Sequence, residues 1–217
     1  MNNIEFYKRV ITSIILLPIT IICIFFSKYL FLIFLILIAI ISLIEWYLIY
    51  KKINNAVFAF GSVLIFISII SAYNLRGDNL DDVTFFMWVL FICFFSDVGG
   101  YTFGKIIGGK KLSKISPNKT VSGALGSIIF SFIPILIINY QIYFDTSLDL
   151  TLPNLILSLI VSVICQLGDI LVSYFKRIGK IKNTGNILPG HGGLLDRIDG
   201  ILFVLPIVFL FKFLGLI

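Results

Sequence analysis

The chain has 217 residues, of which 59% are apolar and 13% are charged, and its mean hydropathy is +1.08. This composition excludes an ordinary water-soluble domain, and the length allows several membrane spans of roughly 20 residues each. The formal net charge is +6, but the basic residues flank apolar runs instead of covering a polar surface. We therefore assign them to membrane orientation and contact with anionic lipids, and we expect no nucleic-acid partner.

Continuous apolar runs predict an all-α fold, a polytopic membrane bundle of about seven transmembrane helices. The runs lack the alternation of polar and apolar residues that the strands of a membrane barrel need, so helices are favoured. The expected helices cover residues 11–26, 29–50, 56–73, 84–104, 121–144, 153–175 and 200–217.

The distribution of basic residues predicts how these helices are oriented. Cytoplasmic loops of membrane proteins are enriched in Lys and Arg. If the N-terminus is cytoplasmic, all basic residues except Lys28, Arg76 and Lys212 fall in cytoplasmic segments or at their edges. The first three helices contain little polar chemistry, so we divide the chain into N-terminal helices, 1–78, and a catalytic half, 79–217.

The densest polar segment lies between two apolar runs, from Ser173 to Asp199. It contains five basic residues, two aspartates and the only histidine of the chain. Ionisable groups beside a membrane span cost desolvation energy, so a cluster of them indicates function. We expect an active site for a charged substrate at the membrane surface.

Asp169, Ser173 and Lys176 are spaced so that they share one face of the sixth predicted helix. One interpretation is a packing pair between Asp169 and Lys176 within the membrane. The interpretation we prefer is that Asp169 binds a metal ion.

Asp196 and Asp199 are three residues apart at the start of the last predicted span, which places both on one face of a helix. Alternatively, Asp196 caps that helix and Asp199 pairs with a cation. Carboxylate oxygens, without paired cysteines or a second histidine, point to magnesium and not to zinc. The sequence leaves open whether a second, monovalent cation also binds.

Glycines surround His191 in the sequence LPGHGG. Gly192 and Gly193 can turn backbone N–H groups toward a phosphate, although a glycine-rich segment between helices is often only a turn. His191 is a phosphate contact, a general base or a loop residue, and we favour the phosphate contact.

A second polar cluster starts at Asp97 and continues through repeated glycines to a lysine-rich segment. The glycines are equally compatible with close helix packing, and the lysines with membrane anchoring. We expect Ser116, Lys119 and Thr120 to lie near phosphates. Glu45 and Trp46 near the end of the second predicted helix could be functional, but we favour an ordinary interfacial aromatic site.

The polar segments resemble those of bacterial phosphatidate cytidylyltransferases, also called CDP-diacylglycerol synthases. The resemblance extends upstream to Asp169, Gly168 and Gln166 and to the segment 97–123. Asn183 and Ser122 stand where this family usually has acidic residues, so a diverged, weakly active CTP- or lipid-binding relative is the alternative. The residues that fit the C-terminal motif in register are Ser173, Lys176, Arg177, Lys182, Gly185, Leu188, Pro189, His191, Gly192, Gly193, Asp196, Arg197 and Asp199.

The resemblance implies transfer of CMP from CTP to phosphatidate in the bacterial inner membrane, at a site that faces the cytoplasm. It implies Mg²⁺ held by Asp169 and Asp196, with Asp199 assisting. The catalytic set is then Asp169, Asp196, Asp199, Lys176, Arg177 and His191. The substrate-binding set is Ser173, Lys182, Arg197, Gly192, Gly193, Asp97, Lys119, Thr120 and Ser116. The partners are CTP, phosphatidate and membrane lipids, and a homodimer stays open.

A secondary transporter is the rival from another class, because intramembrane aspartates also serve coupling ions. In a transporter such charges lie near mid-membrane, between repeated halves of the chain. Here they gather beside one membrane face and no inverted repeat is visible. The enzyme is therefore favoured.

Overall fold

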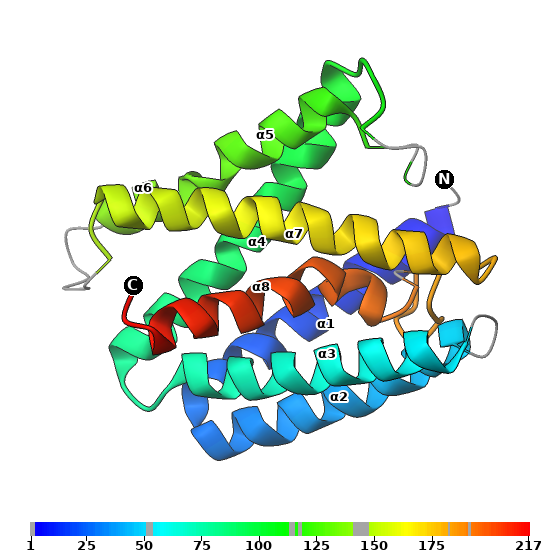
Figure 1. The fold of residues 1–217 in the computed structure, drawn as a ribbon, viewed down its shortest axis with the longest axis horizontal. Coiled ribbons are helices and arrows are strands. Elements are labelled where there is room, and N and C mark those ends of the chain that lie inside the picture. Colours follow the sequence, from blue (N-terminus) through cyan, green and yellow to red (C-terminus); the bar gives the residue numbers. More distant parts are fainter. Residues whose placement is uncertain are drawn as a thin grey trace.

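The computed structural model describes residues 3–50, 54–112, 116, 119–140, 148–181, 183–190 and 192–217. Within these ranges the only regular elements are helices (Figure 1). Their bounds are Asn3–Phe26 (α1), Lys28–Tyr50 (α2), Asn55–Arg76 (α3), Leu80–Ile106 (α4), Val121–Ser131 (α5), Ile133–Tyr140 (α6), Leu152–Ile178 (α7) and Leu195–Phe213 (α8).

The prediction of a polytopic helical membrane bundle is confirmed. In the described part of the chain, six spans are long and apolar enough to cross a membrane, with α5 and α6 counting as one. The 19 residues of α8 approach the length of a span, but this helix has Asp196, Arg197 and Asp199 in its first turns and Lys212 in its last. Its interior is apolar, and its buried residues include Leu202, Val204 and Val208.

Three features of the predicted helices were wrong. The first helix begins at Asn3 instead of residue 11. The expected helix 121–144 is divided at Phe132, because Pro134 has no backbone N–H to donate to the preceding turn and its ring disfavours a continuous helix. The part of this prediction at 141–144 lies outside the described residues. The last helix begins at Leu195 instead of residue 200. Hydropathy alone does not detect a first helical turn that contains charged residues.

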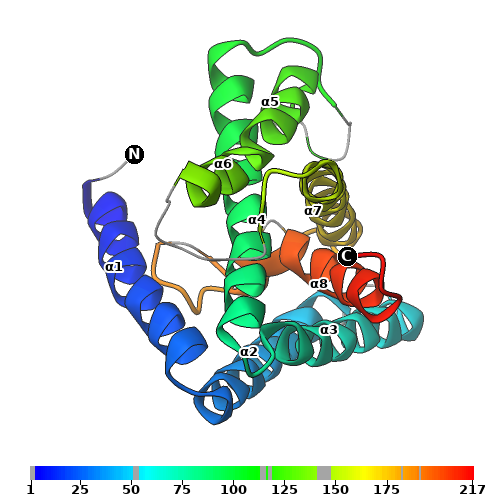
Figure 2. The same cartoon turned by 90° about the vertical axis from the view of Figure 1, so that its left-hand side faces the viewer.

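Successive spans run in opposite directions, so the bundle has two distinct ends (Figure 1). We call the end where α2, α4 and α7 finish and α3, α5 and α8 begin the site end. The far end is where α1, α3 and α8 finish and α2, α4 and α7 begin. The long α4 crosses the middle of the molecule and packs against α5 (Figure 2). The alternation agrees with the predicted topology, whereas the side of the membrane that each end faces stays a prediction.

The glycines after Asp97 bring α4 and α5 into close contact. A Cβ atom at Gly99 would collide with the backbone oxygen of Gly126, and one at Gly123 would collide with that of Gly100. Glycine is required on both helices at this crossing, as small residues commonly are in membrane helix pairs. The packing interpretation of these glycines is therefore the one that their contacts support.

Candidate active site

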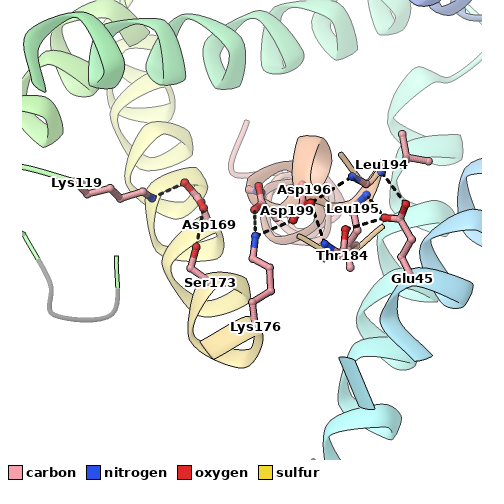
Figure 3. A network of polar contacts seen from close by, with 12 residues as sticks. Glu45, Lys119, Asp169, Ser173, Lys176, Thr184, Leu194, Leu195, Asp196 and Asp199 are labelled. Atoms are coloured by element: carbon pink, nitrogen blue, oxygen red, sulfur yellow. Dashed lines mark hydrogen bonds and ion pairs between the residues drawn. The ribbon is translucent and has the colours of Figure 1, made fainter. Parts of the chain in front are cut away.

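The polar face predicted for α7 is present, but its residues have different partners from those of the packing interpretation. Ser173 Oγ donates a hydrogen bond of 3.3 Å to Asp169 Oδ1. Lys176 does not pair with Asp169. Its Nζ atom lies 2.9 Å from Asp196 Oδ1 and 3.8 Å from Asp199 Oδ2, so it links α7 to α8 (Figure 3).

Lys119 joins the cluster from the segment that precedes α5. Its Nζ atom lies 2.5 Å from Asp169 Oδ2 and 3.4 Å from the backbone oxygen of Gln166. The side chains of Lys119 and Asp169 are 25% and 33% exposed, compared with 11% and 12% for Lys176 and Asp196. The Lys119–Asp169 pair is thus more exposed than the Lys176–Asp196 pair, which lies where α7 meets α8.

Two glycines bring the aspartates of α7 and α8 together. A Cβ atom at Gly168 would meet the Phe203 ring and the backbone oxygen of Asp199, and a Cβ atom at Gly200 would meet Cys165. Asp169 directly follows the first of these glycines, and Asp199 directly precedes the second. The close approach of the helices therefore places the Asp169 and Asp199 carboxylates near enough to interact electrostatically.

Asp196 is the most completely bonded carboxylate of the cluster. Its Oδ1 atom accepts from Lys176, and its Oδ2 atom accepts from the backbone N–H groups of Thr184, at 3.0 Å, and Gly193, at 3.3 Å. Both N–H groups precede α8, so Asp196 does not cap this helix as the alternative expected but holds the segment before it. Asp199 is 9% exposed, and its Oδ1 atom accepts from the N–H group of Gly200 at 2.9 Å.

Asp97 and Arg197 complete the charged surroundings. Asp97, on α4, has an exposed side chain and lies within electrostatic range of Asp169, Lys119 and Arg197. Arg197 is also exposed. These two residues are thus the exposed members of the charged surroundings.

Other predicted site residues have local structural roles. Thr120 is the N-cap of α5, where its Oγ1 atom accepts from the N–H group of Gly123 at 3.1 Å. The backbone oxygen of Ser116 accepts from the N–H group of Lys119 at 3.1 Å.

Arg177 is exposed and follows Lys176 on a different side of α7. Lys182 and His191 lie outside the described residues.

The glycine-rich segment forms a tight turn. Leu188 and Gly192 exchange two backbone hydrogen bonds, of 2.9 and 3.1 Å, and Gly190 and Gly192 have φ angles of 78° and 89°. The N–H groups of Gly192 and Gly193 thus donate to Leu188 and Asp196 respectively. The turn interpretation accounts for these contacts, and phosphate binding by the same N–H groups stays a prediction.

Sequence reasoning left a function for Glu45 open but favoured an ordinary interfacial site. The Glu45 carboxylate is 0% exposed and accepts hydrogen bonds from residues at both ends of the segment 184–195. Trp46 is not the exposed ring that the interfacial interpretation expected. This ring is 3% exposed, donates to the backbone oxygen of Val57 at 3.0 Å and packs edge-on against Phe175. The available signal was an acidic residue within an apolar span, which indicates function by default.

The donor set has the chemistry that magnesium prefers, since Asp169, Asp196 and Asp199 offer only carboxylate oxygens. Among the described residues, however, no three acidic, thiol or imidazole side chains converge tightly enough to hold a metal ion by themselves. Mg²⁺ commonly uses one or two carboxylates and completes its shell with water and substrate phosphates. The carboxylates therefore fit a Mg²⁺ ion whose shell is completed by water and phosphate, and magnesium itself stays a prediction.

The apolar cavity of the bundle is separate from this cluster. It has a volume of about 190 Å³ and lies between α1, α2, α3, α4 and α8. Ile198, Leu202 and Leu205 line it from α8. Helical spacing puts these residues on the opposite side of α8 from Asp196. The polar chemistry is therefore concentrated between α7, α8 and the segments that meet them.

A half-buried cluster of aspartates and lysines at one end of a multi-pass helical bundle defines an integral membrane protein with an enzyme-like polar site. Residues 49–214 match the model of the cytidylyltransferase family. The chain belongs to this family, so the resemblance seen in its motifs is confirmed.

Several curated relatives are named phosphatidate cytidylyltransferase. The chain is 36% identical to the one from Rickettsia conorii over 95% of its own length and 90% of the relative's. It is 37% identical to the one from Rickettsia bellii, over 94% and 89% of the two lengths. Identity to the one from Staphylococcus saprophyticus is 42%, over 63% of this chain and 50% of the relative. The match covers about half the length of that staphylococcal relative.

Proposed function

We propose that the chain is a phosphatidate cytidylyltransferase, which converts CTP and phosphatidate into CDP-diacylglycerol and pyrophosphate. Membership of the cytidylyltransferase family and the names of the relatives support this assignment. The structural observation that supports it best is the position of the charged cluster. It lies where α7 ends and α8 begins, at the ends of apolar helices, where a lipid phosphate and a water-borne nucleotide can meet.

The reaction needs cations more than it needs a protein nucleophile. A phosphate oxygen of phosphatidate attacks the α-phosphorus of CTP, and the bond from that phosphorus to the oxygen bridging to the β-phosphate breaks. Pyrophosphate takes the electron pair and leaves. Both reactants are anions, so catalysis depends on offsetting the negative charge that accumulates at the reacting phosphates. The attacking oxygen already has a negative charge and needs no general base.

The side chains of the cluster divide into two roles in this proposal. Lys119, Lys176 and Arg197 offset the charge of the substrate phosphates, and Arg177, Lys182 and His191 are further phosphate contacts. Asp169 and Asp196 hold Mg²⁺, with Asp199 assisting and Asp97 nearby. When bound, this ion neutralises and orients phosphate oxygens. Without it, three aspartates outnumber the two lysines that pair with them, which disfavours an anionic substrate.

We propose that the site end faces the cytoplasm of a bacterial cell, with the chain in its inner membrane. The excess of Lys and Arg in the segments of this end supports the orientation. CTP is a cytoplasmic metabolite, so the same orientation gives the site access to the nucleotide.

Release of pyrophosphate by the purified protein tests the function. The protein in detergent is supplied with CTP, MgCl₂ and phosphatidate, each of which is omitted in turn, and the lipid product is identified by its mass. We expect pyrophosphate and CDP-diacylglycerol in equal amounts, with a requirement for all three components. A cytidylyl group trapped covalently on the protein would contradict the direct transfer described above.

A diverged binding protein is the second candidate, because Asn183 and Ser122 replace residues that are usually acidic in the family. Ser122 Oγ donates to the backbone oxygen of Gly108 and shares a 3.0 Å hydrogen bond with Thr120, so it supports the segment before α5. Binding of CTP without pyrophosphate release would favour this candidate. Failure to bind CTP at all would argue against both.

A further inference from the structure

Glu45 is a buried carboxylate that the proposed reaction does not use. It lies in the last turns of α2 and is 0% exposed. Burial of a charged carboxylate costs several kcal/mol unless hydrogen bonds compensate it. An apolar side chain at this position would avoid that cost. The groups that compensate the carboxylate therefore indicate what Glu45 does.

The three groups that donate to Glu45 come from the segment that leads into α8. Its Oε1 atom accepts from the N–H group of Leu194 at 2.9 Å, and its Oε2 atom accepts from the N–H group of Leu195 at 2.7 Å. The hydroxyl of Thr184 donates to Oε2 at 2.9 Å. These contacts join positions 139 to 150 residues apart in the chain, and Figure 3 shows them side by side with the charged cluster.

Glu45 supplies the N-terminal cap that α8 lacks. The N-cap residue Leu194 has no side-chain oxygen, and no local side chain caps this helix. The first N–H groups of a helix have no partners within it, and a negative charge there also interacts favourably with the helix dipole. A carboxylate from α2 therefore sets where α8 begins.

The same backbone positions also hold Asp196. Thr184 gives its hydroxyl to Glu45 and its N–H group to Asp196. A Cβ atom at Gly193, whose N–H group donates to Asp196, would collide with the Glu45 carboxylate, and so would one at Gly185. Both glycines are needed for this close approach. Movement of the Glu45 carboxylate would thus disturb the groups that fix Asp196 against Lys176.

We infer that Glu45 is a positioning residue for the site: it orders the segment 184–195 and thereby places Asp196 opposite Lys176. The inference rests on the proposed function for its catalytic consequence, whereas the ordering itself is a property of the fold. It also gives Gly185 and Gly193 a role in packing around a carboxylate, beside the phosphate-binding role expected of Gly193.

The test compares Glu45→Gln with a matched variant at the far end, Arg76→Gln. Arg76 is also a buried charged residue, 5% exposed, and its guanidinium donates to the backbone oxygens of Ile24 and Gly77. Both substitutions remove a charge that links backbone segments, but only the first touches the segment 184–195. Hydrogen exchange of the amides of this segment is measured in both purified variants, together with turnover per folded molecule.

We expect Glu45→Gln to speed amide exchange at Leu194 and Leu195 and to lower turnover by about 10- to 100-fold, the range typical of a misplaced catalytic group. The KM for CTP is expected to change much less, because a positioning defect acts mainly in the transition state. Arg76→Gln should leave both the amide exchange of the segment 184–195 and the turnover of the variant per folded molecule close to the wild-type values.

Thr184 keeps the inference testable if Glu45→Gln does not fold. Thr184→Val removes the donor but keeps the shape, and Thr184→Ser restores the hydroxyl. We expect the first to raise exchange at residues 194 and 195 and lower turnover, and the second to stay near wild type. Unchanged exchange in Glu45→Gln or Thr184→Val, or an equal change in Arg76→Gln, would overturn the inference. If the wild type releases no pyrophosphate, the proposed function fails, while the exchange data still decide whether Glu45 orders the segment.

Discussion

The two ends of the helical bundle treat charge differently. At the far end, each cation has its own partner. Lys28 Nζ lies 2.6 Å from Asp78, Lys212 Nζ lies 2.5 Å from Asp82, and Arg76 caps the backbone of α1. At the site end, Lys176 is shared by two aspartates, and Asp196 is shared by a lysine and two backbone N–H groups. The charged groups of the far end thus make isolated contacts, whereas those of the site end form a connected network.

Burial separates the Lys176 pairs of the site end from the two ion pairs of the far end, whereas the Lys119–Asp169 pair, 25% and 33% exposed, resembles the far-end pairs. Asp78 is 73% exposed, and Lys212 and Asp82 are 36% and 29% exposed. The side chains of Lys176, Asp196 and Asp199 are only 11% to 12% exposed. Charges held in a less polar environment interact more strongly with one another and with a bound phosphate. The network at the site end is therefore the part of the molecule suited to chemistry.

Neutralising one carboxylate at each end should give the largest difference in activity between the two ends. Asp196→Asn is expected to lower pyrophosphate release by at least about 100-fold, because it removes charge where the proposed reaction needs it. Asp169→Asn should behave similarly. Asp82→Asn, the matched change at the far end, should stay within about twofold of wild type, since it removes only a partly exposed pair. Turnover is measured on protein that remains monodisperse in detergent, and near-normal activity of Asp196→Asn would contradict the assignment.

Replacing one lysine at each end compares the same two regions through the free energy of unfolding. Lys176→Met leaves Asp196 and Asp199 side by side and mostly buried without their shared cation, so we expect a loss of about 3 kcal/mol in the free energy of unfolding. Lys212→Met breaks a more exposed pair and should cost less than about 1 kcal/mol. Denaturant titration in detergent micelles measures both. Equal losses would mean that the two ends do not differ in how they hold charge.

The sequence predicted the contacts that depend on local spacing. Asp169, Ser173 and Lys176 share a face because helical geometry places residues four and seven apart together. The same argument placed Asp196 and Asp199 at the start of the last helix. It did not predict their partners, since Lys176 bonds to α8 and not to Asp169.

Contacts between distant segments could not be predicted from local pattern. Lys119 reaches Asp169 across 50 positions, and Glu45 reaches Leu195 across 150. Both depend on how the helices pack, which one sequence does not specify. The start of α8 was misplaced for a related reason, because its cap comes from α2 and its first turn is polar. The division at Phe132, by contrast, follows from Pro134 and was within reach of sequence reasoning.

The smallest expected effect concerns Asn183, which lies beside the network and stands where the family usually has aspartate. Its side chain is exposed, so a charge placed there is well solvated and screened by salt. We expect Asn183→Asp to leave turnover unchanged or to raise it by less than about threefold.

Thr184, the neighbour of Asn183, faces inward and is 1% exposed. Thr184→Val should therefore reduce turnover far more than Asn183→Asp changes it. Steady-state pyrophosphate release at two salt concentrations measures both variants. A large loss in Asn183→Asp would show that the asparagine has a role of its own, and that the network at the site end extends beyond its buried members.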